Sequence, residues 1–445
     1  MRVLMFGWEY PPHISGGLGT ACFGLTTALT KKGVDILFVV PKLFGDEYVS
    51  GARLLSAEQV SNALARMDIS QIESVLSDLC NRISYVEIDS LLVPYIGQKD
   101  YYGILESRKK KIESEKKKTE SRSVKTDSEK ETGDFKYSFS GGYGENLFEE
   151  VERYALVAGS VAKQNDFDVI HSHDWLTYKA GIVSKQISGK PLIVHVHATE
   201  YDRSGENINR QVYQIEKQGM DFADRIIAVS EFTRDILIRK YGQPPQKVIT
   251  VHNGVDSTYR DVQRVFNPFD KKIVSFIGRI TFQKGPDYFV EAADMVLKKD
   301  RNFVFVMAGK GDMMNRMIAL VARKRISENF FFAGFLLQQE VSRLLAMSDM
   351  YVMPSVSEPF GISPLEAMQA STPAIISKQS GVSEILRNVI KVDFWDIEAM
   401  ADAIYAIGNH DVLRQRLSRK AKEEVAGISW DGAADKIREI YFQLK

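Results

Sequence analysis

The stretch "RVLMFGWEYPPHISGGLGTACFGLTTALTKKGVDILFVVPK" at residues 2–42 joins two apolar runs through a glycine-rich loop and an amphipathic segment. The runs "RVLMFG" and "DILFVV" show no polar alternation, which is typical of strands buried on both faces of a parallel sheet. The segment between them has the length and pattern of one helix. The stretch therefore predicts a strand-helix-strand unit with a right-handed crossover in an α/β protein.

The same alternation continues along the chain in two series. "DVIHSH", "PLIVHVH", "RIIAVS" and "KVITVHN" follow the first unit, and "IVSFIGR", "FVFVMAG", "NFFFAG", "MYVMPS" and "PAIIS" follow a polar stretch at residues 259–272. This break predicts two Rossmann-like, doubly wound domains, residues 1–264 and 265–426. Residues 427–445 read as one amphipathic helix with Trp430, Ile437, Ile440 and Tyr441 on one side.

Composition excludes several classes of protein. The 445 residues are 44% hydrophobic and 26% charged, with Lys+Arg and Asp+Glu equal at 58 each, so no net field attracts nucleic acid or an anionic membrane. Two cysteines, Cys22 and Cys80, supply neither a disulfide framework nor a metal-ligand cluster and fit core thiols in a reducing compartment. No apolar run reads as a signal peptide or a transmembrane segment. We expect a cytoplasmic, soluble protein.

Residues 107–133, "SRKKKIESEKKKTESRSVKTDSEKETG", contain only Ile112 and Val124 as large apolar residues. Such a segment cannot bury enough surface to offset its ordering entropy, so we predict a mobile charged insertion in the first domain. Its lysine clusters leave open a contact with a membrane or polyanion. Interleaved glutamates weaken that field and favour a solvated loop.

The first glycine-rich loop predicts an anion site. Gly16 and Gly17 let the backbone approach a ligand, and the following helix directs free N–H groups and its positive end toward a phosphate. A dinucleotide site is not expected, because Cys22 stands where the third glycine would be and the second strand ends at Lys42. A tight turn without a ligand remains the alternative.

In the second domain, Arg279 ends a strand and Lys284 precedes a helix that Pro286 and Asp287 would start well. Two fixed cations beside a helix N-terminus suit a diphosphate and the charge that builds on a leaving group. Either cation could instead be an ordinary surface charge.

The stretch "SVSEPFGISPLEAM" at residues 355–368 carries the strongest local signal. Ser363 and Glu366 fit a capping box, which alone would account for Glu366. A capping box does not account for Glu358. The following proline keeps Glu358 extended, and Gly361 permits a turn with exposed amides before the helix. A carboxylate beside free N–H groups suits the hydroxyls of a sugar.

These residues resemble the signature of retaining GT-B glycosyltransferases, particularly the family 4 group. The spacing from Glu358 to Glu366 with "EPFG" carries the resemblance. Further motifs follow in family order: "GGLG" in the first loop, "HSHDW" at 171–175, "HNGVD" at 252–256, "GR" followed by "KG", and "AGKGD" at 308–312. The resemblance covers nearly the whole chain except the charged insertion. It implies the GT-B fold, with two domains facing across a cleft and the last helix packed on the first domain.

The resemblance also implies site residues. Arg279 and Lys284 would hold the donor diphosphate, and Glu358 would bind the transferred sugar. His197 in "VHVHATEYDRSG" resembles the family histidine that reaches this sugar from the first domain, with His195 as the competitor. The implied donor-binding set is Gly16, Gly17, Gly309, Gly311, Phe360, Gly361, Ile362 and Glu366, in which Glu366 accepts from the ribose hydroxyls. Asp174 and Trp175 would lie on the acceptor side.

The resemblance also implies a reaction without a bound metal and without a cofactor, in which the nucleotide sugar is a substrate. Asp166 and Asp168 match the D-x-D motif of metal-dependent transferases. They lead directly into an apolar strand, so we interpret them as residues at the start of that strand. The chain looks most like glycogen and starch synthases, with UDP- or ADP-glucose as the expected donor. Ile14 and Phe360 differ from the bacterial enzymes that use ADP-glucose.

Three alternatives stay open at the level of sequence. A family 4 enzyme could transfer to another polysaccharide or to a glycolipid. A GT-B epimerase or phosphorylase would need other groups, and a phosphorylase would need a pyridoxal phosphate lysine for which no motif stands out. A catalytically silent sugar-binding protein is disfavoured by the intact Glu358, Glu366, Arg279 and Lys284.

Overall fold

The computed structural model describes residues 1–13, 16–61, 139–144, 146–256 and 267–445. The charged insertion predicted at 107–133 lies outside the described residues, as do Ile14, Cys80 and part of the predicted linker. Within the described ranges, no helix combines the length and apolar character needed to cross a membrane.

Two parallel sheets confirm the α/β fold class. The first has the order β3-β2-β1-β4-β5-β6-β7 and the second the order β10-β9-β8-β11-β12-β13. Strands of the first sheet are β1 (Arg2–Phe6), β2 (Asp35–Val40), β3 (Arg53–Ser56), β4 (Val169–His173), β5 (Leu192–Val196), β6 (Arg225–Ala228) and β7 (Val248–Thr250). Strands of the second are β8 (Lys272–Ile277), β9 (Phe303–Ala308), β10 (Phe330–Gly334), β11 (Met350–Met353), β12 (Ala374–Ser377) and β13 (Ile390–Val392).

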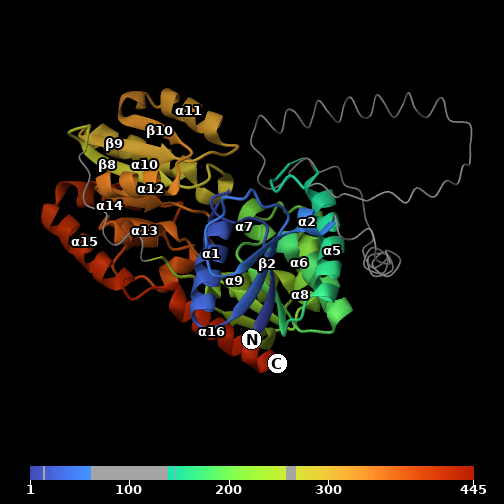
Figure 1. The fold of residues 1–445 in the computed structure, drawn as a ribbon. Helices are drawn as coiled ribbons and strands as arrows, with labels where there is room; N and C mark the ends of the chain where they lie inside the picture. Colours follow the sequence, from blue (N-terminus) through green and yellow to red (C-terminus); the bar gives the residue numbers. More distant parts are fainter. Residues whose placement is uncertain (14–15, 62–138, 145, 257–266) are drawn as a thin grey trace, which may run out of the picture.

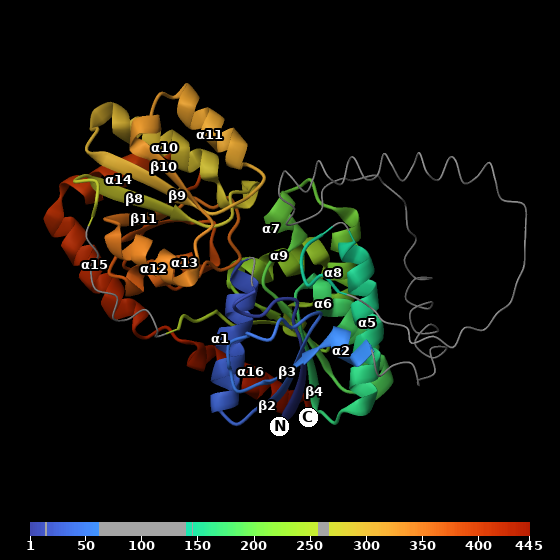
Figure 2. The same cartoon turned by 45° about the horizontal axis from the view of Figure 1, so that its top comes forward.

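Helices cover both sheets and give two lobes, which Figures 1 and 2 show side by side. The amino-terminal lobe contains α1 (Gly17–Lys31), α2 (Ala57–Ser61), α5 (Leu147–Gln164), α6 (Trp175–Ser188), α7 (Glu200–Ser204), α8 (Arg210–Phe222) and α9 (Glu231–Tyr241). The carboxyl-terminal lobe contains α10 (Pro286–Lys299), α11 (Met314–Arg323), α12 (Gln338–Met347), α13 (Ser363–Gln369), α14 (Ile397–Asn409) and α15 (Asp411–Val425). Short 3-10 turns are η2 (Pro245–Lys247), η4 (Phe282–Lys284), η5 (Ser327–Asn329) and η6 (Gly381–Glu384).

The last helix, α16 (Trp430–Leu444), leaves the carboxyl-terminal lobe and packs beside α1 under the amino-terminal lobe (Figures 1 and 2). Its buried face belongs to the same apolar cluster as β1, β2 and α1. Tyr441 reaches the sheet, where its hydroxyl lies 2.6 Å from Nδ1 of His171. The chain therefore ends as part of the lobe in which it begins.

Each sheet has one point where the strand order reverses, between β1 and β4 in the first and between β8 and β11 in the second. In doubly wound sheets, ligands bind in the crevice outside the carboxyl ends of the strands at such a point. The loops after β1, β4, β8 and β11 contain the glycine-rich loop, Asp174, Arg279 and Glu358. The topology therefore brings the sequence-predicted residues to the functional edge of each sheet.

The lobes are joined by defined contacts. At the start of α9, the amides of Glu231 and Phe232 donate to the Glu384 carboxylate at 2.9 and 2.6 Å, and Nε2 of His252 lies 2.8 Å from it. Burial alone would raise the pKa of Glu384, but these hydrogen bonds hold that pKa below its ordinary value. Ile362 packs against apolar clusters of both lobes. The loop before α13 thus touches the amino-terminal lobe directly.

Candidate functional site

Glu358 lies in the loop between β11 and α13 and is only 6% exposed. Its carboxylate accepts from the Lys284 ammonium and, at 3.3 Å, from the Ser355 hydroxyl. Its backbone N–H donates to the carbonyl of Gln379 at 3.0 Å, and its carbonyl accepts from Gly381 at 2.9 Å. A buried carboxylate needs such compensation. The side chain is therefore held in one place.

The turn after Glu358 presents hydrogen-bond donors. Gly361 has a φ of +99°, which a glycine adopts without strain. The carbonyl of Pro359 accepts from the Ser230 hydroxyl of the other lobe at 2.5 Å. Among the described residues, no acceptor lies in hydrogen-bond range of the backbone N–H groups of Phe360 and Gly361. The carboxylate of Glu358 and these two amides thus offer an acceptor and donors to one ligand.

The predicted cation pair lies beside this loop. Lys284 ends η4 and pairs with Glu358, while Nη2 of Arg279 donates to Oε1 of Gln283 at 3.3 Å. The carbonyl of Gln283 accepts from the backbone of Val356 at 2.9 Å, which ties the two loops together. The structure therefore brings Lys284 and Glu358 into contact and holds Arg279 within the same pair of loops.

Glu366 is on α13, and the capping box predicted for it is wrong. The helix has Ile362 as its N-cap, and no side chain caps it. Burial, with the nearby Asp256 carboxylate, raises the pKa of Glu366 to about 7. Glu366 is thus not engaged in capping its own helix and is close to half-protonated at neutral pH.

Close packing of two backbone segments explains why Gly309 and Gly311 are glycines. A Cβ at Gly309 would lie 1.8 Å from the carbonyl oxygen of Gly278, and one at Gly311 would lie 2.2 Å from that of Ile280. The loops after β8 and β9 therefore pack backbone against backbone. Their donor-binding role stays a prediction. A Cβ at Gly16 or Gly17, in contrast, would meet no atom of the described residues within 4 Å, so these residues leave open space at the start of α1.

Four histidines form a ladder across the first sheet. His171 and His173 are on β4, His195 is on β5, and His197 follows it. Nε2 of His171 lies 3.3 Å from Nδ1 of His195, and Nδ1 of His173 lies 2.9 Å from Nε2 of His197. Burial lowers the pKa of all four, to about 3 for His171 and His197. The ladder is therefore uncharged at neutral pH.

His197 is the half-buried end of this ladder, whereas its competitor His195 is 1% exposed. The backbone N–H of His197 donates to Oδ1 of Asp174 at 2.7 Å. Asp174 is buried, and burial raises its pKa to about 6. Trp175 is also buried and belongs to the core. Both predicted acceptor-side residues thus lie beneath the surface, where Asp174 orients the loop that bears His197. Their acceptor role stays a prediction.

One hydrogen bond connects the His197 segment to the Glu358 loop. The Ser357 hydroxyl donates to Oδ1 of Asp202, on α7, at 2.6 Å. The other carboxylate oxygen, Oδ2, accepts from the backbone N–H and the hydroxyl of Thr199 at 2.7 Å each. Asp202 therefore links the residues after His197 to the residue before Glu358. Sequence reasoning missed this pair, since nothing local to either segment indicates a partner 155 positions away.

We expect Ser357→Ala to lower kcat/KM by about 10- to 100-fold, because a hydrogen bond to a charged group contributes about 1.5 to 3 kcal/mol. The melting temperature should fall by a few degrees at most, because Oδ1 of Asp202 loses its bond to Ser357 while Oδ2 keeps its bonds to Thr199. Ser383→Ala is the matched control, because among the described residues the Ser383 hydroxyl donates to the carbonyls of Lys378 and Ser380, both in the carboxyl-terminal lobe, at 3.0 and 2.6 Å. Equal activity losses in both variants would contradict the positioning role.

Three family models match consecutive parts of the chain. Residues 2–113 match the starch synthase catalytic domain, residues 144–259 match Glycosyltransferase Family 4, and residues 260–424 match glycosyl transferases group 1. The two parallel-sheet α/β lobes described above have the GT-B fold of solved glycosyltransferases. The chain is a GT-B glycosyltransferase.

This glycosyltransferase is similar to known proteins along its whole length. It is 23% identical to a glycogen synthase of Mycobacterium tuberculosis, over 100% of this chain and 95% of that protein. It is 25% identical to an uncharacterized glycosyltransferase of Methanocaldococcus jannaschii, over 99% and 98% of the two chains. Its fold matches a sucrose-phosphate synthase from Thermosynechococcus elongatus with a TM-score of 0.68 at 17% identity, covering 100% of this chain and 98% of the other. The GT-B glycosyltransferase is thus of the glycogen and starch synthase-like type.

Proposed function

We propose that this glycosyltransferase transfers a hexose, best assigned as glucose, from a nucleoside-diphosphate sugar to a glycan with retention of the anomeric configuration. The observation that carries the proposal is the Glu358 loop. A compensated carboxylate, two amides that have no partner among the described residues and the Lys284 ammonium converge there at the carboxyl end of β11. These groups complement the hydroxyls and the diphosphate of one donor.

The diphosphate is assigned to Arg279 and Lys284, with the N-terminus of α1 at Gly16 and Gly17 facing it from the other lobe. Fixed positive charge beside a leaving diphosphate stabilises the charge that develops as the glycosidic bond breaks. Lys284 pairs with Glu358 in the structure. Donor binding would draw its ammonium toward the phosphates and leave Glu358 to accept from sugar hydroxyls. The positive charges of Arg279 and Lys284 support a reaction that needs no bound metal.

His197 is assigned to the transferred sugar. Because burial lowers its pKa to about 3, the ring is neutral at pH 7 and hydrogen-bonds without adding charge. The Asp202–Ser357 bond supports this arrangement, since it draws the His197 segment toward the Glu358 loop. Closure of the lobes on the donor would exclude water and limit hydrolysis.

We assign the enzyme to the cytoplasm. The free thiol of Cys22 fits this reducing compartment.

Glycogen or another α-glucan is the acceptor we assign. The full-length similarity to a glycogen synthase supports this choice. Another polysaccharide or a glycolipid is the second candidate, because the same fold occurs in a sucrose-phosphate synthase, whose name indicates a different acceptor. The fold alone thus does not select the acceptor.

The test is a screen of UDP-, ADP- and GDP-sugars, each incubated with and without glycogen and scored by nucleoside diphosphate release. We expect acceptor-dependent release with UDP- or ADP-glucose. Product linkage analysed by NMR should show the α configuration of the donor preserved. Absence of release with every donor would contradict transferase activity, and an inverted product would contradict retention.

The proposed ribose contact of Glu366 predicts a pH dependence. Its pKa of about 7 means that Glu366 is mostly ionised at pH 8 and mostly protonated at pH 6. Ribose hydroxyls donate to the ionised form, so the donor KM should rise roughly tenfold as the pH falls from 8 to 6. Glu366→Gln should raise KM and flatten this dependence. An unchanged pH profile in that variant would remove the assignment.

A further inference from the structure

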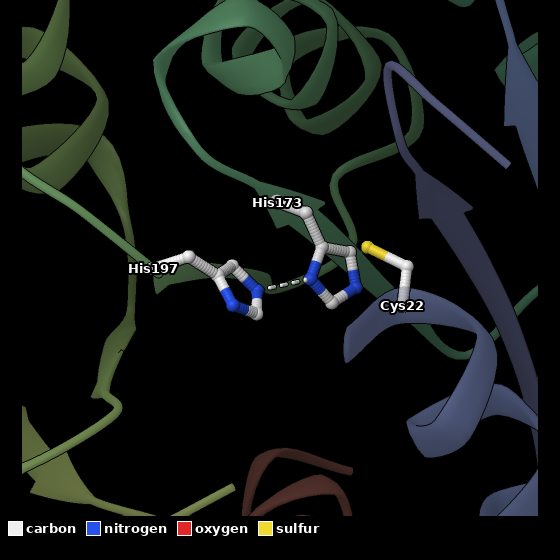
Figure 3. Close-up of side chains that lie close together, drawn as sticks. All are labelled: Cys22, His173 and His197. Atoms are coloured by element: carbon white, nitrogen blue, oxygen red, sulfur yellow. Dashed lines mark hydrogen bonds between the residues drawn. The ribbon is translucent and has the colours of Figure 1, made fainter. Parts of the chain in front are cut away.

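Cys22, His173 and His197 meet beside the proposed donor site. Each offers one ligand atom, and the three atoms lie within 4.8 Å of one another. They come from α1, from the last residue of β4 and from the residue after β5. Figure 3 shows the ring of His173 between the thiol of Cys22 and the ring of His197. Residues separated by 151 and 24 positions are thus assembled into one cluster.

The cluster leaves a buried nitrogen without a partner. His173 is 0% exposed, and among the described residues nothing hydrogen-bonds to its Nε2. Buried polar atoms are nearly always paired, so an unpaired one indicates an absent ligand or an unusual role. The only hydrogen bond recorded for the His173 ring in this part of the chain is the 2.9 Å contact between its Nδ1 and Nε2 of His197. A cation bound to Nε2 of His173 and to Nε2 of His197 would take the place of this hydrogen bond.

The ligand types select the class of cation. One thiolate and two imidazoles suit zinc and similar transition metals, whereas magnesium and calcium prefer oxygen ligands. Ligand atoms on a tetrahedral zinc ion lie roughly 3.3 to 3.6 Å apart, given bonds of about 2.0 to 2.3 Å. Side-chain rotations that bring the cluster together by about 1 Å would reach this geometry. Three protein ligands leave a fourth position open.

A second group of three ligands lies deeper in the same lobe. His171, His173 and His195 also offer nitrogen atoms within 4.8 Å of one another. Both ring nitrogens of His171 already have partners, at Tyr441 and His195, and all three rings are fully buried. The Cys22 group has a thiol and includes the half-buried His197, through which an ion can enter. The Cys22 group is therefore the better site.

We propose that Cys22, His173 and His197 bind a zinc-class divalent cation, and that binding inhibits the enzyme by withdrawing His197 from the donor sugar. On binding, the Cys22 thiol loses its proton to solvent. The proton between the two rings moves to a ring nitrogen that does not face the ion. The inhibitory part rests on the proposed function, because it needs His197 at the donor. The binding part does not.

Cobalt(II) added to the full-length enzyme tests the binding part, because a cysteine thiolate bound to cobalt gives a charge-transfer band in the near ultraviolet. We expect this band in the wild type and its displacement by zinc. Cys22→Ala and the near-isosteric Cys22→Ser should lose the band. Cys80→Ser, which removes the other cysteine, should keep it. No band in the wild type, or a band that survives in both Cys22 variants, would overturn the site.

Zinc inhibition tests the second part. We expect micromolar zinc to stop transfer by the wild type and a chelator to restore it. Cys22→Ala should keep its basal activity and need at least tenfold more zinc for half inhibition. Equal zinc sensitivity in wild type and Cys22→Ala would overturn the inhibitory role. If no donor supports transfer, the cobalt band still decides the binding site, so the two failures are distinguishable.

Discussion

Replacing Glu358 with alanine is expected to lower kcat by about 10² to 10³, while the melting temperature stays within a few degrees of the wild type. The variant removes the proposed acceptor of the sugar hydroxyls and the partner of Lys284. Loss of one charged contact made at the reacting centre has an effect of this size. The fold should survive, because the side chain of Lys284 is 22% exposed and its ammonium can turn toward solvent.

Steady-state kinetics with the donor found in the screen, together with thermal unfolding, measure this result. Glu358→Gln keeps the shape of the side chain and should lose most of the activity as well. Glu328→Gln is the control, because its carboxylate is 91% exposed and lies 4.0 Å from Arg301. Turnover of Glu358→Ala near that of Glu328→Gln would show that Glu358 has no part in the reaction.

Trp430→Ala should lower the free energy of unfolding by about 3 to 5 kcal/mol, which is the usual cost of removing a buried tryptophan. Trp430 is 5% exposed at the start of α16 and packs in the cluster formed by β1, β2 and α1. A Cβ added at Gly24 of α1 would lie 2.2 Å from Nε1 of Trp430, so the helices meet without spare room. The amino-terminal lobe should therefore lose much of its support.

Chemical denaturation followed by circular dichroism measures this change. Trp395→Ala is the matched control, because Trp395 is 58% exposed and its loss should cost under about 1 kcal/mol. Similar destabilisation by the two variants would contradict the role of α16. A larger effect of Trp430→Ala on the amino-terminal lobe, seen by hydrogen exchange, would show that the chain end stabilises the lobe in which it begins.

Most of the fold could be predicted from local pattern. Strands such as β4 and β5 are buried at every position, and their apolar runs indicated a parallel sheet. The positions of Glu358 and Lys284 at the carboxyl-terminal edge of the second sheet were also predictable, since each follows a strand there, and their roles stay predictions. The capping box at Ser363 was wrong because Ile362 occupies the N-cap position. The pattern indicated a helix start but not the position of its first turn.

The role of a side chain was harder to predict from the sequence where that role depends on whether the side chain is buried. Asp174 and Trp175 follow β4, as a site residue would, yet Asp174 is buried beneath the loop of His197 and Trp175 is buried in the core. Gly309 and Gly311 fit the pattern of a ligand-binding loop. In the structure, the backbone of the neighbouring loop lies so close that it leaves no room for a Cβ at either position. A sequence motif identifies the residue type at a position. It does not tell whether the side chain faces a ligand or another part of the protein.

The sequence by itself determined two parallel sheets, their helices and the residues at the strand ends, because hydrophobic periodicity and glycine placement act over a few neighbouring residues. Only the tertiary structure decided that Asp202 meets Ser357, that Tyr441 meets His171, and that Cys22 joins the histidine ladder. These contacts join residues far apart in the chain. Such pairs leave no local pattern, since their meeting depends on how two lobes and a returning helix pack.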